Sequence, residues 1–199
     1  MTESVPLVDG YYGREMDRAA FDVFFSEHVK SVFGSTRSLP VHRLMTPDER
    51  EAEAGLRARM GEPISLYFGI YTADHEQIGW SYGFQEGSQR FYMCNTGILA
   101  AHRRQGLYKA LLPVIVNRVA AMGFQIIFSR HAMTNNAVII PKLRAGFVIS
   151  NFELSDRFGT LVHLSYFTNA GRRNAMDYQC GQANLDPVFQ TMMETPQKE

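Results

Sequence analysis

The sequence predicts an α/β (α+β) fold, with a mixed, mostly antiparallel central sheet and helices on both faces. Three consecutive segments rich in β-branched and aromatic residues are separated by short polar turns, a pattern typical of an antiparallel meander. A helix, a short apolar strand, a second helix and two more strands follow, and this order adds a strand–helix–strand crossover to the sheet. The hydrophobic fraction of 45% provides enough apolar residues for one core.

Two helices are predicted before the sheet. The first covers residues 17–33 and carries an apolar stripe on one face. That stripe consists of Phe21, Phe24, Phe25, Val29, Val32 and Phe33. The second covers residues 47–60, with Thr46 as its N-cap, Pro47 in its first turn and acidic residues next.

The remaining elements follow in chain order. The predicted strands cover residues 64–72, 77–86, 90–100, 124–130, 147–154 and 160–167. The predicted helices cover residues 105–122, 134–145 and 170–179. Gly123 and Gly146 end the first two of these helices. Pro113 and Pro141 lie inside them, and each should bend its helix or mark an end.

Charge and cysteine content exclude several classes of function. Lys+Arg and Asp+Glu both total 20, which argues against a generic nucleic-acid binder. Cys94 and Cys180 are far apart and have no histidine at ligand spacing, so no metal site is expected and the chain is typical of a reduced, cytoplasmic protein. No apolar run approaches the roughly 20 residues of a membrane span, and the first residues contain no apolar signal-peptide core.

One domain is expected over residues 1–168, with its core at 64–167 and a partly disordered C-terminal extension at 169–199. The extension carries a short apolar patch formed by Val188, Phe189, Met192 and Met193. A patch of this kind needs a partner surface, which leaves a homodimer open.

The stretch HRRQGLYKALL, residues 102–112, has the composition of an anion site. A strand ends near Ala100, and a loop containing Gly106 leads directly into a helix. The first N–H groups of a helix have no partner within the helix and, with the helix dipole, attract anions. The alternative is a turn that needs glycine for its φ angle, and spacing alone favours that alternative.

The same stretch resembles the acyl-CoA-binding motif of the GCN5-related N-acetyltransferases, Arg/Gln-x-x-Gly-x-Gly/Ala. The resemblance implies acetyl-CoA as co-substrate, no metal, and a strand before the loop that bulges and splays from its neighbour. Ile98 and Ala100 would then offer backbone groups to pantetheine. The pyrophosphate cradle would be formed by Arg103, Arg104, Gln105, Gly106, Leu107, Tyr108 and Lys109. Tyr108 stands where the family has Gly or Ala, and Ala100 stands where it has Pro.

A second stretch, NNAVIIPKLRAGF, resembles the family's Asn-x-x-Ala-x-x-x-Tyr-x-Lys-x-Gly-Phe element. Asn135 and the Gly146–Phe147 pair match it. In the family this asparagine contacts pantetheine, whereas an N-cap is the structural alternative for Asn135. Lys142 occupies the position of the tyrosine that protonates the departing thiolate in many members. Lys142 could donate a proton or offer charge, although a solvated helix lysine is the favoured interpretation.

The catalytic base is not identified by any motif. Glu86 and His131 lie at strand ends and are candidates, as are Glu153 and His163, although each is more often a solvated turn residue or a hydrogen-bonded core histidine. By resemblance, the backbone N–H of Leu99, or that of Ile98, would stabilise the oxyanion.

Two adjacent residues of the splayed strand, Cys94 and Asn95, are expected to face opposite sides of the sheet. Cys94 is interpreted as a small buried residue and not as a nucleophile.

The resemblance implies an acetyltransferase, an acyltransferase for groups other than amino-acyl groups. It would move an acetyl group from acetyl-CoA to an amine of a small molecule or amino acid by direct transfer in a ternary complex, with no nucleic acid or membrane as partner. The alternative is a CoA-binding module of the same fold with little or no catalysis. A nucleotide-binding α/β domain is disfavoured because neither GxxxxGK[ST] nor GxGxxG occurs.

The acceptor pocket is expected between the first two helices and the hairpin at 147–167. Its expected aromatic residues are Phe21, Phe25, Tyr82, Phe84, Phe152, Phe158 and Tyr166, and for Phe21 and Phe25 a packed core is the favoured interpretation.

Overall fold

The computed structural model describes residues 3–34, 39–181, 184, 186–187 and 190–191. Eight strands form one sheet in the order β1-β2-β3-β4-β5-β6-β8-β7. The strands are β1 (Val5–Pro6), β2 (Tyr11–Glu15), β3 (Ser65–Thr72), β4 (Gln77–Gln85), β5 (Arg90–Ile98), β6 (Ile126–Ala132), β7 (Val148–Ser155) and β8 (Gly159–Phe167). Among these strands only β5 and β6 pair in parallel, which confirms the mixed, mostly antiparallel sheet.

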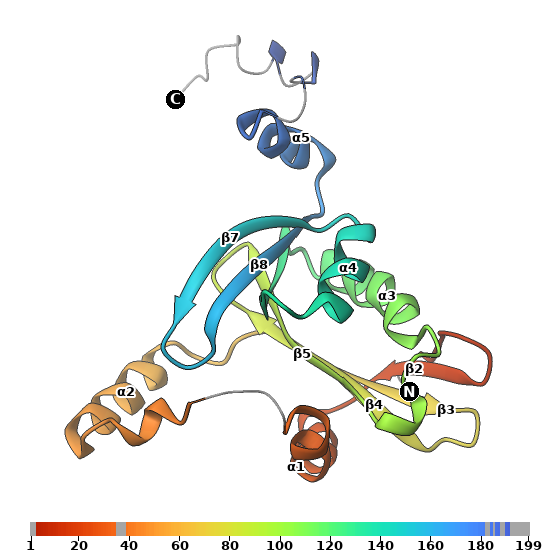
Figure 1. Ribbon diagram of the computed structural model, residues 1–199, viewed down its shortest axis with the longest axis vertical. Helices are drawn as coiled ribbons and strands as arrows, with labels where there is room; N and C mark the ends of the chain where they lie inside the picture. Colours follow the sequence, from red (N-terminus) through yellow and green to blue (C-terminus); the bar gives the residue numbers. More distant parts are fainter. Residues whose placement is uncertain (1–2, 35–38, 182–183, 185, 188–189, 192–199) are drawn as a thin grey trace.

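Helices cover both faces of the sheet. They are α1 (Arg18–Phe33), α2 (Pro47–Arg59), α3 (Leu107–Ala121), α4 (Asn136–Arg144) and α5 (Ala170–Gln179), with single 3₁₀ turns at η1 (Val41–Arg43) and η2 (Ala100–His102). Figure 1 shows α3 and α4 on one side of the sheet and α1 on the other. The predicted order of elements is confirmed from α1 to α5, and Thr46 caps α2 through a capping box with Glu49.

Two strands were missed by the sequence analysis. β1 and β2 form a short hairpin before α1, and β2 pairs with β3 through all five of its residues. The signal was the Asp9–Gly10 dipeptide, because Gly10 has a φ of 80° and that conformation suits a hairpin turn. Both strands are short and contain polar and apolar residues in no regular order, so no alternating hydrophobic pattern identified them.

The main core lies between the sheet and the helices α3 and α4. The α3 residues Leu107, Leu111, Leu112, Ile115 and Val119 are buried and form one apolar face at helical spacing. Both helices continue through their prolines, each of which leaves one backbone carbonyl of the preceding turn without its usual donor.

On the opposite face, Trp80 anchors α1 to the sheet. Its side chain is completely buried, and its indole N–H donates to Asn95 Oδ1 at 2.6 Å. The rings of Phe24, Phe25 and Phe33 meet it edge-on with centroids 5.5–6.0 Å apart. The next strand gives the indole room only because residue 97 is a glycine.

We predict that Gly97→Ala lowers the free energy of unfolding by about 1–3 kcal/mol, because its Cβ would overlap the Trp80 ring in a closed site. Chemical denaturation measures the change. The control is Gly55→Ala on α2, where nothing lies within 4 Å of the added carbon, and this change should be neutral or slightly stabilising. Equal stability of both variants would contradict the packing of Trp80 against Gly97.

Candidate functional site

The central feature of the site is a gap between β5 and β6. The two strands pair only through Arg90–Tyr92 and Ile126–Phe128, although both continue beyond these residues. After the Tyr92–Phe128 pair, neither strand has a β-sheet partner on its facing edge. The expected splay is therefore present, and it begins at Met93 on β5 and Ser129 on β6.

A bulge on β5 lies beside this gap. Tyr82 of β4 pairs with Asn95 whereas Gly83 pairs with Met93, so Cys94 is the extra residue. Cys94 and Asn95 were expected to face opposite sides of the sheet, and that expectation is wrong. The Asn95 side chain contacts both neighbours on one face: its Nδ2 donates to Cys94 Sγ at 3.6 Å, and its Oδ1 accepts from the Trp80 indole. Burial raises the pKa of the Cys94 thiol, which keeps it protonated.

The backbone amides of β5 alternate between β4 and the gap. Leu99 was expected to supply the oxyanion donor, but its N–H donates to Ile78 O at 2.9 Å and is therefore committed to the β4 side. Because successive strand amides point to opposite edges, the N–H groups of Ile98 and Thr96 face the gap. These two amides, and not that of Leu99, are therefore oriented toward the gap.

The gap leads to the loop that precedes α3. Gly106 has a φ of 79°, and Arg104, two residues earlier, has a φ of 64°. The first helical hydrogen bond of α3 runs from Ala110 N–H to Gly106 O, so the amides of Leu107, Tyr108 and Lys109 precede the helical ladder. A non-glycine residue in the left-handed region costs about 1–2 kcal/mol, and strained residues of this kind are enriched at functional sites. The loop therefore has the geometry of an anion cradle.

Neighbouring elements hold this cradle in place. The Tyr11 hydroxyl on β2 lies 3.0 Å from His102 Nδ1, and Val8 lies 4.0 Å from where a Cβ on Gly106 would sit. The Arg103 side chain folds back and donates to Ile98 O at 2.7 Å, while the Ala100 carbonyl accepts from the Arg103 amide. The β1–β2 hairpin thus packs beside a cradle for which the sequence analysis named only residues 103–109.

Asn135 lies at the far side of the gap. It occupies the N-cap position of α4, but its side chain makes no capping hydrogen bond and is exposed just beyond the end of β6. The capping interpretation therefore lacks its hydrogen bond. Tyr108 is half-buried on the first turn of α3, and burial raises the pKa of its hydroxyl.

Lys142 lies at the point where β5 and β6 separate, on the face of the sheet covered by α3 and α4. Its Nζ donates to Ser129 Oγ at 2.7 Å and lies 3.4 Å from Met93 Sδ, so it contacts the first unpaired residue of each strand. Only 1% of the side chain is exposed, and the interpretation of Lys142 as a solvated helix lysine is wrong. Burial lowers the pKa of Lys142 to about 7.

His131 belongs to the same cluster. Its Nε2 lies 2.8 Å from Ser129 Oγ, so one hydroxyl joins the histidine to Lys142. Burial, with the nearby Lys142 charge, lowers the pKa of His131 to about 3. The histidine is therefore neutral at physiological pH and faces α3 and α4, opposite to the face that bears Glu86.

A second polar cluster occupies the face covered by α1. Arg130 donates to Glu86 Oε1 at 2.9 Å, and its Nε lies 3.6 Å from Glu153 Oε2. Glu153 also lies 2.7 Å from His163 Nε2. The Arg130 Nε is buried and makes no hydrogen bond. Of the four candidate bases, three therefore gather around one arginine, and His131 is the exception.

A row of neighbouring aromatic rings leads across this face to the cluster. Successive ring centroids lie 5.1–6.4 Å apart through Tyr67, Tyr82, Phe84, Tyr92, Phe128 and His163. Burial raises the pKa values of Tyr82 and Tyr92 to about 12. Phe21 is buried against this row, which confirms its interpretation as a packed residue.

The expected aromatic wall is corrected in one place. Tyr166 packs with Phe147 and with the core on the other face of the sheet, so it cannot line the α1 side. Phe152 and Phe158 are exposed on the β7–β8 hairpin.

The comparisons with known proteins address the fold. The sequence matches no family model and no curated protein. The ribosomal-protein-S5-alanine acetyltransferase of Vibrio fischeri superposes with a TM-score of 0.62 at 12% identity, covering 84% of this chain and 98% of that one. YncA, a putative acetyltransferase from Salmonella typhimurium with acetyl-CoA, gives a TM-score of 0.59 at 16% identity, with 81% and 96% covered. The protein has the GCN5-related N-acetyltransferase fold.

A further similar structure is a variant of the spermidine N-acetyltransferase SpeG from Vibrio cholerae, with a TM-score of 0.57 at 11% identity, covering 80% of this chain and 95% of that one.

The residues beside the gap that the sequence analysis missed are Ser129, Arg130 and Thr96. The period-2 pattern of β6 placed Ser129 and Arg130 on opposite faces, but nothing in the sequence showed that their faces carry Lys142 and Glu86.

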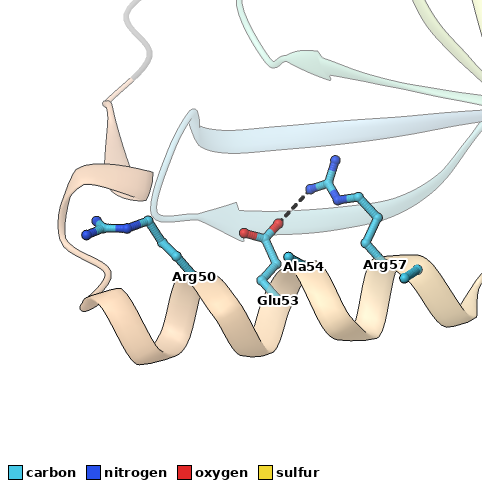
Figure 2. Close-up of a pocket in the computed structure, with 5 residues that line it drawn as sticks. Arg50, Glu53, Ala54 and Arg57 are labelled. Carbon is cyan, nitrogen blue, oxygen red and sulfur yellow. Dashed lines mark hydrogen bonds and ion pairs between the residues drawn. The ribbon is translucent and has the colours of Figure 1, made fainter.

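One open hollow lies elsewhere on the molecule. It is lined by Arg50, Glu53, Ala54, Arg57 and Ala58 of α2, and Figure 2 shows the ion pair between Glu53 and Arg57, which measures 2.6 Å. Figure 1 places α2 near the tip of the β7–β8 hairpin, across the molecule from the start of α3. All of α2 is exposed, and the hollow is a feature of its solvated surface.

Two other kinds of feature are absent from the part of the chain that the structure describes. No helix there is long and apolar enough to cross a membrane. No group of three or more His, Cys, Asp or Glu side chains there is placed to hold a metal ion. The apolar patch of Val188, Phe189, Met192 and Met193 lies outside the described residues.

The lowered pKa of Lys142 predicts how the stability of the protein depends on pH. Between its folded pKa of about 7 and its unfolded value of 10.5, the unfolded chain binds a proton that the folded protein does not, so stability rises with pH. Lys142→Met removes this rise. The stability of the variant relative to wild type should therefore fall by about 3 kcal/mol between pH 7 and pH 9.

Urea denaturation at pH 6, 7, 8 and 9 measures this difference. Lys30→Met, which removes an exposed lysine of α1, is the control and should show no such trend. A difference between Lys142→Met and wild type that stays constant with pH would mean that Lys142 keeps an ordinary pKa.

Proposed function

We propose that this protein is an acetyl-CoA-dependent N-acetyltransferase that moves an acetyl group to an amine of a small molecule or amino acid by direct transfer in a ternary complex. It acts in the cytoplasm as one domain over residues 1–168. The observation that carries the proposal is the gap between β5 and β6, which ends at an amide-lined anion cradle and has a polar cluster on each side of the sheet.

The donor side of the site fits acetyl-CoA. The amides of the cradle, from Arg104 to Lys109, would hold the pyrophosphate, and Gly106 lets the backbone approach it because no side chain intervenes. The gap-facing amides of Ile98 and Thr96 would bind the pantetheine and the thioester oxygen. Acetyl-CoA supplies the activated acetyl group as a thioester.

The acceptor side of the site lies on the α1 face. An amine attacks only when it is neutral, so a group there must take its proton. Glu86 and Glu153 are the carboxylates at the end of the aromatic row, and His163 is hydrogen-bonded to Glu153. The neutral aromatic row suits an amine attached to an apolar or aromatic body. The Cys94 thiol lies beside this row with a raised pKa, which disfavours a covalent acyl-enzyme and supports direct transfer.

One observation favours the alternative, a CoA-binding module with little catalysis. Both carboxylates of the acceptor side contact Arg130, so neither can take a proton from an amine without giving up part of that contact. The module and the enzyme share every prediction about CoA binding. They differ only in whether thiol is released when an amine is present.

The cradle is tested by acetyl-CoA binding. Acetyl-CoA should raise the Tm of the wild-type protein, and Gly106→Val should abolish most of that rise, because valine is strained at a φ of 79° and projects into the cradle. The matched control is Gly123→Val at the other end of α3, where φ is 95° and nothing lies nearby. Gly123→Val should lose a similar amount of stability yet keep the rise with acetyl-CoA.

Calorimetric titration of the two variants with acetyl-CoA gives the affinities directly. Equal affinity in Gly106→Val and Gly123→Val would mean that the loop is only a turn. A wild-type protein that ignores acetyl-CoA but is stabilised by ATP or NAD would overturn the proposed function itself.

The acceptor side is tested by thiol release with a panel of primary amines. With the best acceptor found, Glu153→Gln should lower kcat by about 100-fold or more and leave the thermal shift with acetyl-CoA unchanged. Glu53→Gln on α2 is the control and should behave as wild type. A kcat within twofold of wild type would remove Glu153 as the base and direct the same test to Glu86.

A further inference from the structure

Arg130 carries a buried donor that has no acceptor. It is the second residue of β6 after the last pair with β5, and its side chain lies on the α1 face. Glu86 holds one end of the guanidinium group through Nη2 at 2.9 Å. The Nε atom is buried and makes no hydrogen bond, and Glu153 Oε2 lies 3.6 Å from it, which is too far for one. A buried N–H group without an acceptor is unfavourable, so an oxygen atom of a ligand would stabilise this site.

The charges around this donor indicate which ligand it suits. A planar guanidinium group is well matched to a carboxylate, whereas the carboxylates of Glu86 and Glu153 attract an ammonium group. They also repel a doubly charged anion such as a phosphate. A ligand with an ammonium and a carboxylate side by side would satisfy both signs of charge at once. An α-amino acid has this arrangement, because both groups are bonded to one carbon atom.

The aromatic row indicates which side chain the acceptor carries. The guanidinium carbon of Arg130 lies 4.9 Å from the ring centroid of Tyr92 and 5.5 Å from that of Phe128. From Tyr92 the row continues to Phe84 and Tyr82. An apolar or aromatic side chain on the same carbon atom as the ammonium and carboxylate would therefore lie along these rings.

We infer that the acceptor is a free α-amino acid with an apolar or aromatic side chain, and that Arg130 binds its carboxylate through Nε. The inference rests on the proposed function and narrows the acceptor class at the same site. Arg130 is then a specificity-determining residue.

The exchange of partners at Arg130 also explains how a restrained carboxylate can act as a base. The carboxylate of the acceptor takes the place of Glu153 beside Arg130 Nε, while Glu86 keeps Nη2 in position. Glu153 retains its contact with His163, at 2.7 Å, and no longer faces the arginine. It can then take one proton from the ammonium group, which leaves the nitrogen with a lone pair for attack on the acetyl carbon.

Matched acceptors that differ only at the carboxylate test this inference. For phenylalanine, tyrosine, leucine and methionine, thiol release is measured with the free amino acid, with its α-amide and with the amine that lacks the carboxylate. With the wild-type protein, the free acid should have a kcat/KM about 100-fold higher than either analogue, because the amide is uncharged and the amine has no oxygen at that position. This comparison needs no variant.

Arginine variants assign the preference to a residue. Arg130→Met should lose it through a higher KM for the free acid, while the thermal shift with acetyl-CoA and the use of the decarboxylated amine are kept. Arg130→Lys retains a charge but not the planar fork, and should keep part of the preference. The matched control is Arg90→Met, because the guanidinium carbon of Arg90 also lies over the Phe128 ring, at 4.2 Å, and this variant should keep the full preference.

The outcomes that contradict these ideas are distinguishable. If the amides or the decarboxylated amines react as well as the free acids in every set, the inference is overturned and the acetyltransferase remains. A preference that survives in Arg130→Met, or that disappears in Arg90→Met, removes the role of Arg130. If no primary amine of any kind releases thiol, the proposed function itself has failed.

Discussion

The separation of β5 and β6 after a single short run of pairs is the constraint on which the site depends. Backbone polar groups that lose a strand partner need another, since unpaired buried amides are costly. β5 keeps β4 on one edge through Leu99 and Ile78, and leaves Thr96 and Ile98 facing the gap on the other. The same separation brings Lys142 up to the sheet at one face and leaves Arg130 on the opposite face.

The sequence predicted much of this arrangement because the signals were local. Helical periodicity located α1, and the two family-like stretches fall on the loop before α3 and on α4. The errors around β5 share one cause: the sequence analysis assigned the wrong side of the strand to side chains and backbone amides that alternate along it. A single extra residue at Cys94 turns two consecutive side chains to the same face, and no sequence pattern marks such a residue.

The sequence contained a pattern that indicates the burial of Lys142, but the sequence analysis did not use it. Ile139 lies one helical turn before it on the same face of α4, and Ile139 is buried, so the 3.6-residue period places residue 142 against the sheet as well. The residue type alone favoured a solvent-exposed position for Lys142, because lysine side chains are mostly exposed, and this expectation was wrong. The Glu153–His163 contact had no comparable signal, because it depends on the register of β7 on β8, which itself shifts between Ile149 and Asn151.

The distribution of charge across the sheet explains why the two clusters can coexist. Lys142 and the carboxylates Glu86 and Glu153 would neutralise one another if they shared a face, since opposite charges a few ångströms apart stabilise both ions. The sheet keeps them apart, and Arg130 occupies the carboxylates on the α1 face. A lysine paired with a carboxylate would keep a higher pKa, because an opposite charge nearby favours the charged form. Lys142 has no such partner on its face, and burial lowers its pKa to about 7. The isolation of Lys142 therefore costs stability, because a buried ammonium group without a carboxylate is hard to keep charged.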